Sequence, residues 1–379
     1  MNRTSWLLLI LCLLLPCVTE AKAFSGEDNY SRDLHADGPY IWHDSLGTGA
    51  RIVTVTPEGQ LQDQHVATLA PGYQFKVRTE DGRHQFDVRL HEVSRPSARY
   101  ESASKIFVMS DPHGNFDCFQ SLLRAAGVID ENYHWSFADG HLVIIGDVMD
   151  RGVDVTTIFW LIYQLEAEAS TAGGHVSFLL GNHEPMVLMS DNRYTEDKYL
   201  ALADTLHLPC GMLYGPRTEL GRWLMTRNTM MRIGRNLFVH AGLSPKLYEM
   251  NLPIETINEE ISRGLYLRKK ERKQLSQQVY DLFASDGPIW YRGLVKKKAK
   301  YHPAPADSLD MILARYDADR LYVGHTIFKQ VSKFYKGKVV GVNVNNMKAR
   351  KSLKPRGVLI TPSSAILVTD KGLTKKHIR

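Results

Sequence analysis

Five short apolar runs, each followed closely by a polar residue of a type that binds metals, constrain this chain more than any other feature. The runs are Ile106 to Met109, Leu142 to Ile145, Val176 to Leu180, Leu237 to Val239, and Leu321 to Val323. Continuous apolar runs of this length are typical of strands that are buried on both faces of a sheet. They predict the central strands of the fold.

Helical patterns lie between several of these runs. The apolar spacing predicts helices over 116–126, 155–167 and 308–316, and Asp307 or Ser308 is the expected cap of the third. Strands that alternate with helices indicate a layered α/β core.

The polar residues that follow the runs are the candidate site. They are Asp111 and His113, Asp147, Asn182 and His183, His240, and His325. Because sites in open α/β sheets form at the carboxyl ends of strands, we expect these side chains to converge. Asp111 and His113 would project to the same side if the first strand continued that far.

The donor types indicate which metals fit. Two carboxylates, three imidazoles and an amide oxygen, with no thiolate, suit Mn, Fe or Zn. Six candidate ligands are too many for one tetrahedral zinc with an open position. The set predicts two metal ions that share one carboxylate.

Three blocks resemble the signature of the phosphoprotein phosphatases in the calcineurin-like metallophosphoesterase superfamily. They are Ser110 to Asn115, Gly146 to Gly152, and Gly181 to Glu184. His240-Ala241-Gly242 and Gly324-His325-Thr326 are similar to the two later histidine blocks. The resemblance covers about 105–330, and the amino-terminal third together with Trp290 to Gly293 looks most like the bacterial Shewanella-like branch. It implies a layered sandwich of mixed β-sheets flanked by helices.

The resemblance also implies roles for the metal ligands. Asp111, His113 and Asp147 would hold the first ion. Asp147 would bridge to a second ion that Asn182, His240 and His325 complete. A hydroxide between the ions would attack phosphorus in line.

The remaining site residues are expected to act on the substrate. Arg151 would bind the phosphoryl oxygens, with Asn182 and Arg292 as further phosphate-binding candidates. His183 would protonate the leaving oxygen, and Asp150 would orient its imidazole.

The predicted function is hydrolysis of phosphomonoesters. The expected substrates are proteins that carry phosphotyrosine, phosphoserine or phosphothreonine. An alternative on the same fold is a hydrolase of small phosphoesters or dinucleoside polyphosphates. Glu184, which follows Gly-Asn-His, favours a protein phosphatase instead. A non-catalytic binding module is disfavoured, because such a module should lack ligands or the acid, and Asp150, Asn182 and His183 are present.

The first residues predict export. Arg3 precedes an apolar run that Pro16 ends, and Ala21-Lys22-Ala23 supplies a small-x-small cleavage site. We therefore expect a signal peptide over 1–23 and a periplasmic or secreted protein. A β-rich module is expected over 24–103, and the catalytic domain over 104–379, with helical cap insertions at about 185–222 and 245–302.

The formal charge of the chain is +6. Removal of 1–23 takes away Arg3, Lys22 and Glu20, which gives 6 − 2 + 1 = +5. The excess cations favour phosphorylated protein or peptide partners or a weak attraction to an acidic membrane surface, although a solvated face is the simpler interpretation. No nucleic-acid partner is expected, because no binding motif accompanies the charge.

Cys118 and Cys210 remain after cleavage, and the sequence leaves open whether they pair. Cys118 and Arg124 have the spacing of a cysteine-phosphatase loop. A core helix is the favoured interpretation, because no glycine lies between them.

Overall fold

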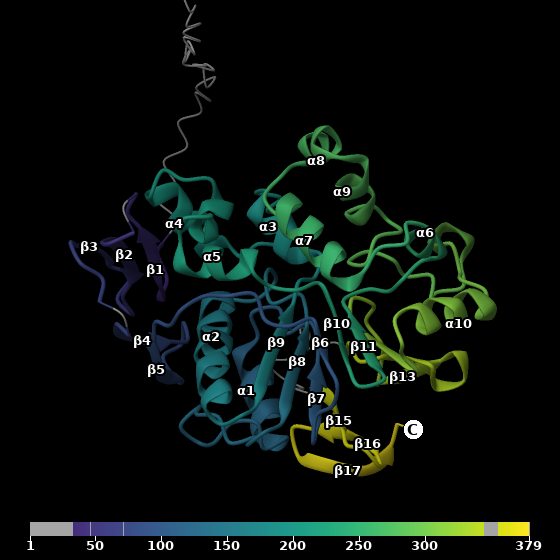
Figure 1. The fold of residues 1–379 in the computed structure, drawn as a ribbon. Coiled ribbons are helices and arrows are strands. Elements are labelled where there is room, and N and C mark those ends of the chain that lie inside the picture. The colour runs from purple at the N-terminus through teal and green to yellow at the C-terminus, as the bar shows by residue number, and fades with distance from the viewer. Residues whose placement is uncertain (1–32, 46, 71, 345–354, 379) are drawn as a thin grey trace, which may run out of the picture. The chain divides into compact units, whose positions relative to one another are not determined.

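The computed structural model describes residues 33–378, except for residues 46, 71 and 345–354. The predicted signal peptide over 1–23 lies outside the described residues. The range Arg32–Arg379 forms one compact unit (Figure 1). None of its described helices is both long and apolar enough to cross a membrane.

Two six-stranded mixed sheets form the centre of the fold. The first has the order β17-β16-β15-β7-β8-β9 and the second the order β13-β14-β12-β11-β10-β6. The bounds of the first sheet are β7 (Ile106–Met109), β8 (His141–Ile145), β9 (His175–Leu179), β15 (Arg356–Ile360), β16 (Ala365–Thr369) and β17 (Gly372–His377). Those of the second are β6 (Arg99–Tyr100), β10 (Met230–Ile233), β11 (Asn236–Val239), β12 (Arg320–Val323), β13 (Ser332–Phe334) and β14 (Val339–Gly341).

All five predicted central strands are confirmed to within one residue, as β7, β8, β9, β11 and β12. Side chains from both sheets share one buried cluster, which includes Val108, Val143, Phe238 and Tyr322. The opposite faces belong to a second, larger cluster that also contains helix residues such as Phe159. Each central strand is therefore covered on both faces, which explains its unbroken apolar sequence.

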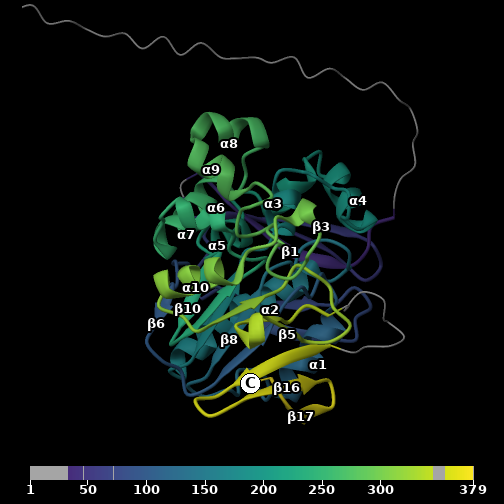
Figure 2. The same cartoon turned by 90° about the vertical axis from the view of Figure 1, so that its right-hand side faces the viewer.

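Helices pack against the sheets, and several lie within 185–222 and 245–302, where the cap insertions stay a prediction. α1 contacts β16 and β17, and α2 contacts β9 (Figure 2). The helices are α1 (Phe116–Ala125), α2 (Val155–Thr171), α3 (His183–Leu188), α4 (Asp197–Thr205), α5 (Glu219–Met225), α6 (Pro245–Glu249), α7 (Ile254–Gly264), α8 (Lys269–Leu275), α9 (Gln277–Leu282) and α10 (Ala306–Arg315). Short 3-10 turns are η1 (Cys210–Tyr214), η2 (Ala299–Tyr301) and η3 (Tyr335–Gly337).

The expected cap of the third predicted helix is wrong. α10 begins at Ala306, its N-cap is Pro305, and no side chain caps it. Asp307 lies in the first turn instead. A carboxylate is stabilising there because it faces the positive end of the helix dipole, so this residue type does not distinguish a cap from a first turn.

The strand-rich amino-terminal region is confirmed. It contains an antiparallel sheet of β1 (Asp37–His43), β2 (Ala50–Val55) and β3 (Leu61–Val66), and a hairpin of β4 (Gln74–Arg78) and β5 (Gln85–Arg89). β1, β4 and β5 pack on α2, and the region contributes side chains to the larger core cluster. β6 pairs with β10 in the second central sheet. The predicted boundary at residue 103, between this strand-rich region and the catalytic part, stays a prediction.

A buried polar network ties β1 to the helices. The Tyr40 hydroxyl donates to Asp37 Oδ2 over 2.5 Å and lies 3.0 Å from Thr156 Oγ1, which lies 2.8 Å from the Tyr214 hydroxyl. The buried ammonium of Lys198 on α4 donates to the Ala36 carbonyl. Because buried polar groups cost free energy unless they are paired, these bonds hold β1 in one position on α2.

Candidate metal centre

The first two predicted ligands lie in a loop, not on a strand. β7 ends at Met109, and both Asp111 (φ 52°) and His113 (φ 45°) adopt the left-handed conformation. The expectation that an extended strand aligns them is therefore wrong. Their positions depend on backbone bonds to the loop after β8, from Asp111 N to Gly146 O (3.1 Å) and from His113 N to Asp147 O (3.0 Å).

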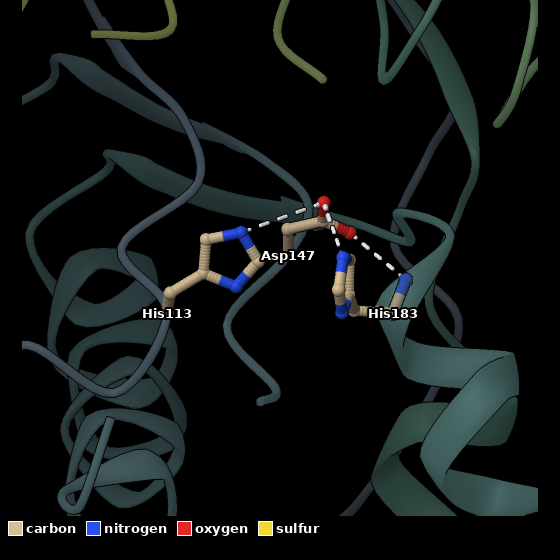
Figure 3. Close-up of side chains that lie close together, drawn as sticks. All are labelled: His113, Asp147 and His183. Carbon is tan, nitrogen blue, oxygen red and sulfur yellow. Dashed lines mark hydrogen bonds and ion pairs between the residues drawn. The ribbon is translucent and has the colours of Figure 1, made fainter. Parts of the chain in front are cut away.

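Asp147 lies at the middle of the centre. Its Oδ2 is 3.2 Å from His240 Nε2, 3.8 Å from His113 Nε2 and 3.9 Å from His183 Nε2. Figure 3 shows the rings of His113 and His183 on either side of this carboxylate. The Oδ1 atom accepts from the backbone N–H of His183 over 3.0 Å, which fixes the orientation of the carboxylate.

The second sheet supplies His240 after β11 and His325 after β12. His240 Nε2 is also 3.1 Å from the Oδ1 atom of Asn182, which follows β9. Ligand atoms of Asp147, His240 and His325 lie within 4.8 Å of one another, as do those of His113, Asp147 and His183. Two candidate metal positions thus share Asp147.

Hydrogen bonds from Nδ1 orient two of the imidazoles towards the centre. The Nδ1 atom of His113 donates to the Met149 carbonyl over 2.8 Å, and that of His240 to the Ile145 carbonyl over 2.9 Å. This leaves each Nε2 facing Asp147. Burial opposes a charged His240, but Asp147 raises the pKa of His240 to about 9, so this ring would release a proton on binding a metal. The buried Nε2 of His325 has no hydrogen-bond partner among the described residues. An orphaned buried nitrogen beside carboxylate and amide oxygens fits a cation at this position.

Asp111 lies at the edge of the centre, close to the segment that carries His325. One of its oxygens accepts from Ser110 Oγ and from the backbone N–H of His325 (3.1 Å). It lines the same cavity as the other ligands, but the geometric group around the first position contains His183 in its place. Its assignment to the first ion stays a prediction.

Two glycines permit this close approach. A Cβ atom at Gly181 would lie 2.2 Å from Asp147 Oδ1, and one at Gly324 would lie 2.5 Å from Asp111 Oδ2. Any side chain at either position would displace a candidate ligand.

Burial and mutual repulsion perturb the ligands. Burial raises the pKa of Asp111 to about 7 and lowers the pKa of His113 to about 3. Burial also lowers the pKa of His325 well below its usual range, and the neighbouring His240 lowers it further. The neutral imidazoles favoured at His113 and His325 are the ligand form.

His183 belongs to a second constellation, formed with Asp150 and Thr195. Its Nδ1 atom donates to Asp150 Oδ2 over 2.6 Å, and Thr195 Oγ1 donates to Asp150 Oδ1 over 2.8 Å. Burial alone would lower the pKa of His183, but Asp147 and Asp150 outweigh it, and the pKa is raised. The imidazole is therefore oriented and favoured in its protonated form. Sequence patterns did not reveal Thr195.

Arg151 is held in place by Tyr194, the residue before Thr195. Its backbone N–H donates to the Tyr194 carbonyl over 2.8 Å, and its guanidinium carbon lies 4.6 Å from the Tyr194 ring centroid. The ring centroid of Tyr194 is also 5.4 Å from that of His183. Stacking on an aromatic face limits the guanidinium to few orientations.

Arg292 reaches the centre from the second predicted insertion. Its NH1 donates to Thr326 Oγ1 over 3.1 Å and to the His325 carbonyl over 3.3 Å. Burial lowers its pKa, while Tyr301, Asp111 and Asp147 favour the charged form. The structure thus brings this candidate into contact with the segment that carries His325.

Glu184 has a structural role that the sequence did not indicate. It is fully buried on α3, and its carboxylate accepts four backbone N–H groups, those of Asp147, Val148, Met149 and Gly181, over 2.6 to 3.2 Å. These bonds fix the loop that carries Asp147 against the loop that carries Asn182.

A cavity of about 620 Å³ lies over the centre. It is lined by all the predicted site residues except Asp150 and His240, which lie behind it. Met186, Tyr194, Trp290, Tyr301 and Ile327 also line it. A larger cavity of about 700 Å³, beside β1 and η1, contains none of the predicted site residues. The chemistry of the donor set, not cavity size, identifies the site.

Of the cysteines that the structure describes, Cys118 and Cys210 are buried and form no disulfide with each other. Cys118 lies on α1, whose Phe119, Leu122 and Leu123 are buried. This confirms the core-helix interpretation of the Cys118 and Arg124 spacing. Burial raises the pKa of Cys118 and of Cys210 to about 12, so neither is an activated thiolate.

The two sheets, the shared carboxylate and the imidazoles define a metal-dependent phosphoesterase site, and the chain belongs to the calcineurin-like phosphoesterase family. The model of that family matches residues 104–327. Similar proteins include an uncharacterized protein of Schizosaccharomyces pombe, 31% identical over 60% of this chain and 69% of its own length. Shewanella-like protein phosphatase 1 of Plasmodium berghei is 29% identical over 59% of this chain and 61% of its own.

A solved structure covers more of the chain. The cold-active protein-tyrosine phosphatase of a psychrophilic Shewanella species superposes with a TM-score of 0.81 at 29% identity. The match covers 91% of this chain and 99% of that one, which includes the strand-rich amino-terminal region. Shewanella-like protein phosphatase 2 of Arabidopsis thaliana is 24% identical over 74% of this chain and 81% of its own length.

Proposed function

We propose that this chain is a metal-dependent protein phosphatase that removes phosphate from phosphotyrosine and, to a lesser extent, from phosphoserine or phosphothreonine. The observation that carries the proposal is the arrangement of two candidate metal positions around Asp147 with His183 held beside them. The names of the similar phosphatases support protein substrates, and the Shewanella enzyme supports phosphotyrosine.

Two ions among Mn, Fe and Zn fit the donor set. Asp111, His113 and Asp147 would hold one, and Asp147, Asn182, His240 and His325 the other. The ions would supply an activated water nucleophile and neutralise charge on the phosphoryl group.

The chain's own residues perform the remaining work. Arg151 and Arg292 line the cavity from two different segments, so their guanidinium groups can bind the phosphoryl oxygens from two sides. His183 donates its proton to the leaving oxygen, and Asp150 holds the imidazole in the orientation that this requires. Tyr194, Trp290 and Tyr301 form aromatic walls that suit the ring of phosphotyrosine.

The test uses residues 24–379 after metal removal and reconstitution with Mn, Fe or Zn. Hydrolysis of phosphotyrosine and phosphoserine peptides is measured beside that of a dinucleoside polyphosphate. We expect metal-dependent turnover of the phosphopeptides and its collapse in Asp147→Asn and His183→Ala. Exclusive cleavage of the dinucleotide would overturn the proposal.

We also propose that the protein is exported, on the evidence of the signal-peptide pattern over 1–23. Fractionation of cells that express the full chain, with mass spectrometry of the mature amino terminus, tests this. A mature chain that starts at Phe24 outside the cytoplasm is the expected result. An intact amino terminus in the cytoplasm would contradict it.

A further inference from the structure

On the described wall of the active-site cavity, the charged side chains outside the candidate metal ligands are cations. The described residues that line it include four cations, Arg151, Arg193, Arg292 and Lys296. The carboxylates among them are Asp111 and Asp147, both candidate metal ligands. Beyond the metal centre, the described wall therefore carries positive charge without compensating acids.

Three of these cations already have partners. Arg151 stacks on Tyr194, and Arg292 donates to Thr326 Oγ1. Arg193 forms a two-bond ion pair with Asp191, with distances of 2.8 and 2.7 Å. Its charge is therefore largely neutralised.

Lys296 is held less closely than the other three. It is half-buried, and its ammonium lies 5.9 Å from the ring centroid of Phe328. Within the described part of the chain, no carboxylate lies within ion-pair distance of it. A cation on the wall of a cavity without an acidic partner is available to an anionic group of a ligand.

The backbone places Lys296 one turn after Arg292. The N–H of Lys296 donates to the Arg292 carbonyl over 2.9 Å, and both side chains line the cavity. Side chains four residues apart on one turn lie roughly 6 Å from each other. In an extended peptide, residues two positions apart project to the same side with a spacing of about 7 Å.

Because Lys296 lies one turn from Arg292 on the same cavity wall, an acidic side chain on the same face of a bound peptide as the phosphorylated residue would lie near its ammonium. We propose that Lys296 forms a subsite for a carboxylate, and that preferred substrates carry Asp or Glu two positions from the phosphorylated residue. The inference rests on the proposed phosphatase activity and names the class of phosphopeptide that the site selects. Trp290 and the exposed side chain of Ile327 supply apolar surface to the same cavity.

The test compares three phosphotyrosine peptides of equal length, one neutral, one with Glu two positions before the phosphotyrosine, and one with Glu two positions after it. We measure kcat/KM for the wild type, Lys296→Glu and Lys270→Glu. The Lys270 variant makes the same charge change on α8, at an exposed residue that does not line the cavity. Thermal unfolding verifies that both variants are folded.

For the wild type we expect kcat/KM of one of the two acidic peptides to be about 3- to 10-fold higher than that of the neutral peptide. This ratio should fall as the salt concentration is raised. Lys296→Glu should abolish or reverse this preference, whereas Lys270→Glu should keep it. Affinities of matching non-hydrolysable phosphonate peptides, measured by fluorescence anisotropy, should follow the same order.

Equal kcat/KM for the three peptides in the wild type would overturn the subsite. So would a preference that persists in Lys296→Glu. Failure to hydrolyse any phosphopeptide, by a protein that hydrolyses p-nitrophenyl phosphate, would instead refute the protein-phosphatase proposal. In that case the anisotropy comparison still decides whether Lys296 binds the carboxylate.

Discussion

The imidazole of His183 donates to Asp150 over 2.6 Å, and the other oxygen of this carboxylate accepts from Thr195 over 2.8 Å. Both oxygens of Asp150 are thus occupied, and the carboxylate cannot rotate without breaking a bond. The opposite ring nitrogen of His183 is left facing the metal centre, 3.9 Å from Asp147 Oδ2. Asp150 therefore fixes the orientation of the proposed proton donor, and Asp147 and Asp150 together favour its charged form.

His183→Ala should impair substrates according to their leaving groups. A phenol of high pKa needs a proton as the P–O bond breaks, whereas p-nitrophenolate leaves without one. We expect kcat to fall about 100- to 10,000-fold for a phosphotyrosine peptide and markedly less for p-nitrophenyl phosphate. Steady-state kinetics with a series of aryl phosphates measures this dependence. Equal losses across the series would argue against His183 as the general acid.

Thr195→Val should lower kcat with little change in KM. The substitution keeps the shape of the side chain but removes the bond to Asp150, and a loss of about 0.5–1.5 kcal/mol corresponds to roughly 2- to 12-fold. Thr195→Ser is the matched control, because it retains the hydroxyl. If the Val and Ser variants behave alike, the hydroxyl has no positioning role.

Glu184→Gln should destabilise the fold around the metal centre. The four N–H groups that converge on the carboxylate would meet an amide with a single acceptor oxygen and an N–H₂ group that is itself a donor. We expect a loss of about 2–4 kcal/mol in the free energy of unfolding, measured by urea denaturation of the metal-free protein. Glu131→Gln changes an exposed carboxylate outside the centre and serves for comparison. An unchanged urea midpoint in Glu184→Gln would contradict the assigned role.

The raised pKa of Asp154 predicts that the free energy of unfolding depends on pH. Burial raises the pKa of this carboxyl group to about 6, against an ordinary value of 3.8. The folded state therefore holds the proton more tightly than the unfolded state. The ionised group destabilises the fold above about pH 6, and this penalty disappears as the pH falls towards 4.

Asp154→Asn removes the titration and can keep the hydrogen bond from the Glu80 N–H, which is 2.8 Å long. At pH 7.5 the variant should be more stable than the wild type by about 1–3 kcal/mol, and at pH 4 the two should converge. Urea unfolding at several pH values tests this. A difference that is constant with pH would show that Asp154 does not titrate as expected.

The central strands were predictable from the sequence because burial on both faces leaves no room for polar residues. The candidate metal ligands were recognisable because they follow those strands in a fixed order. The cap of α10 was not, since Asp307 is equally favourable in the first turn. The alignment of Asp111 with His113 was not either, because β7 stops at Met109 and left-handed backbone places them instead.

The sequence by itself determined which donors are available and the order in which the chain delivers them, since each apolar run specifies a strand and the next polar residue its end. Only the tertiary structure decided how they meet. The strands divide between two sheets, and the N–H of His325 reaches Asp111 across 214 residues of chain. Glu184, Tyr194 and Thr195 became supporting residues through contacts that no local pattern encodes. Local patterns follow from burial and backbone geometry, whereas these contacts depend on the packing of segments that are distant in sequence.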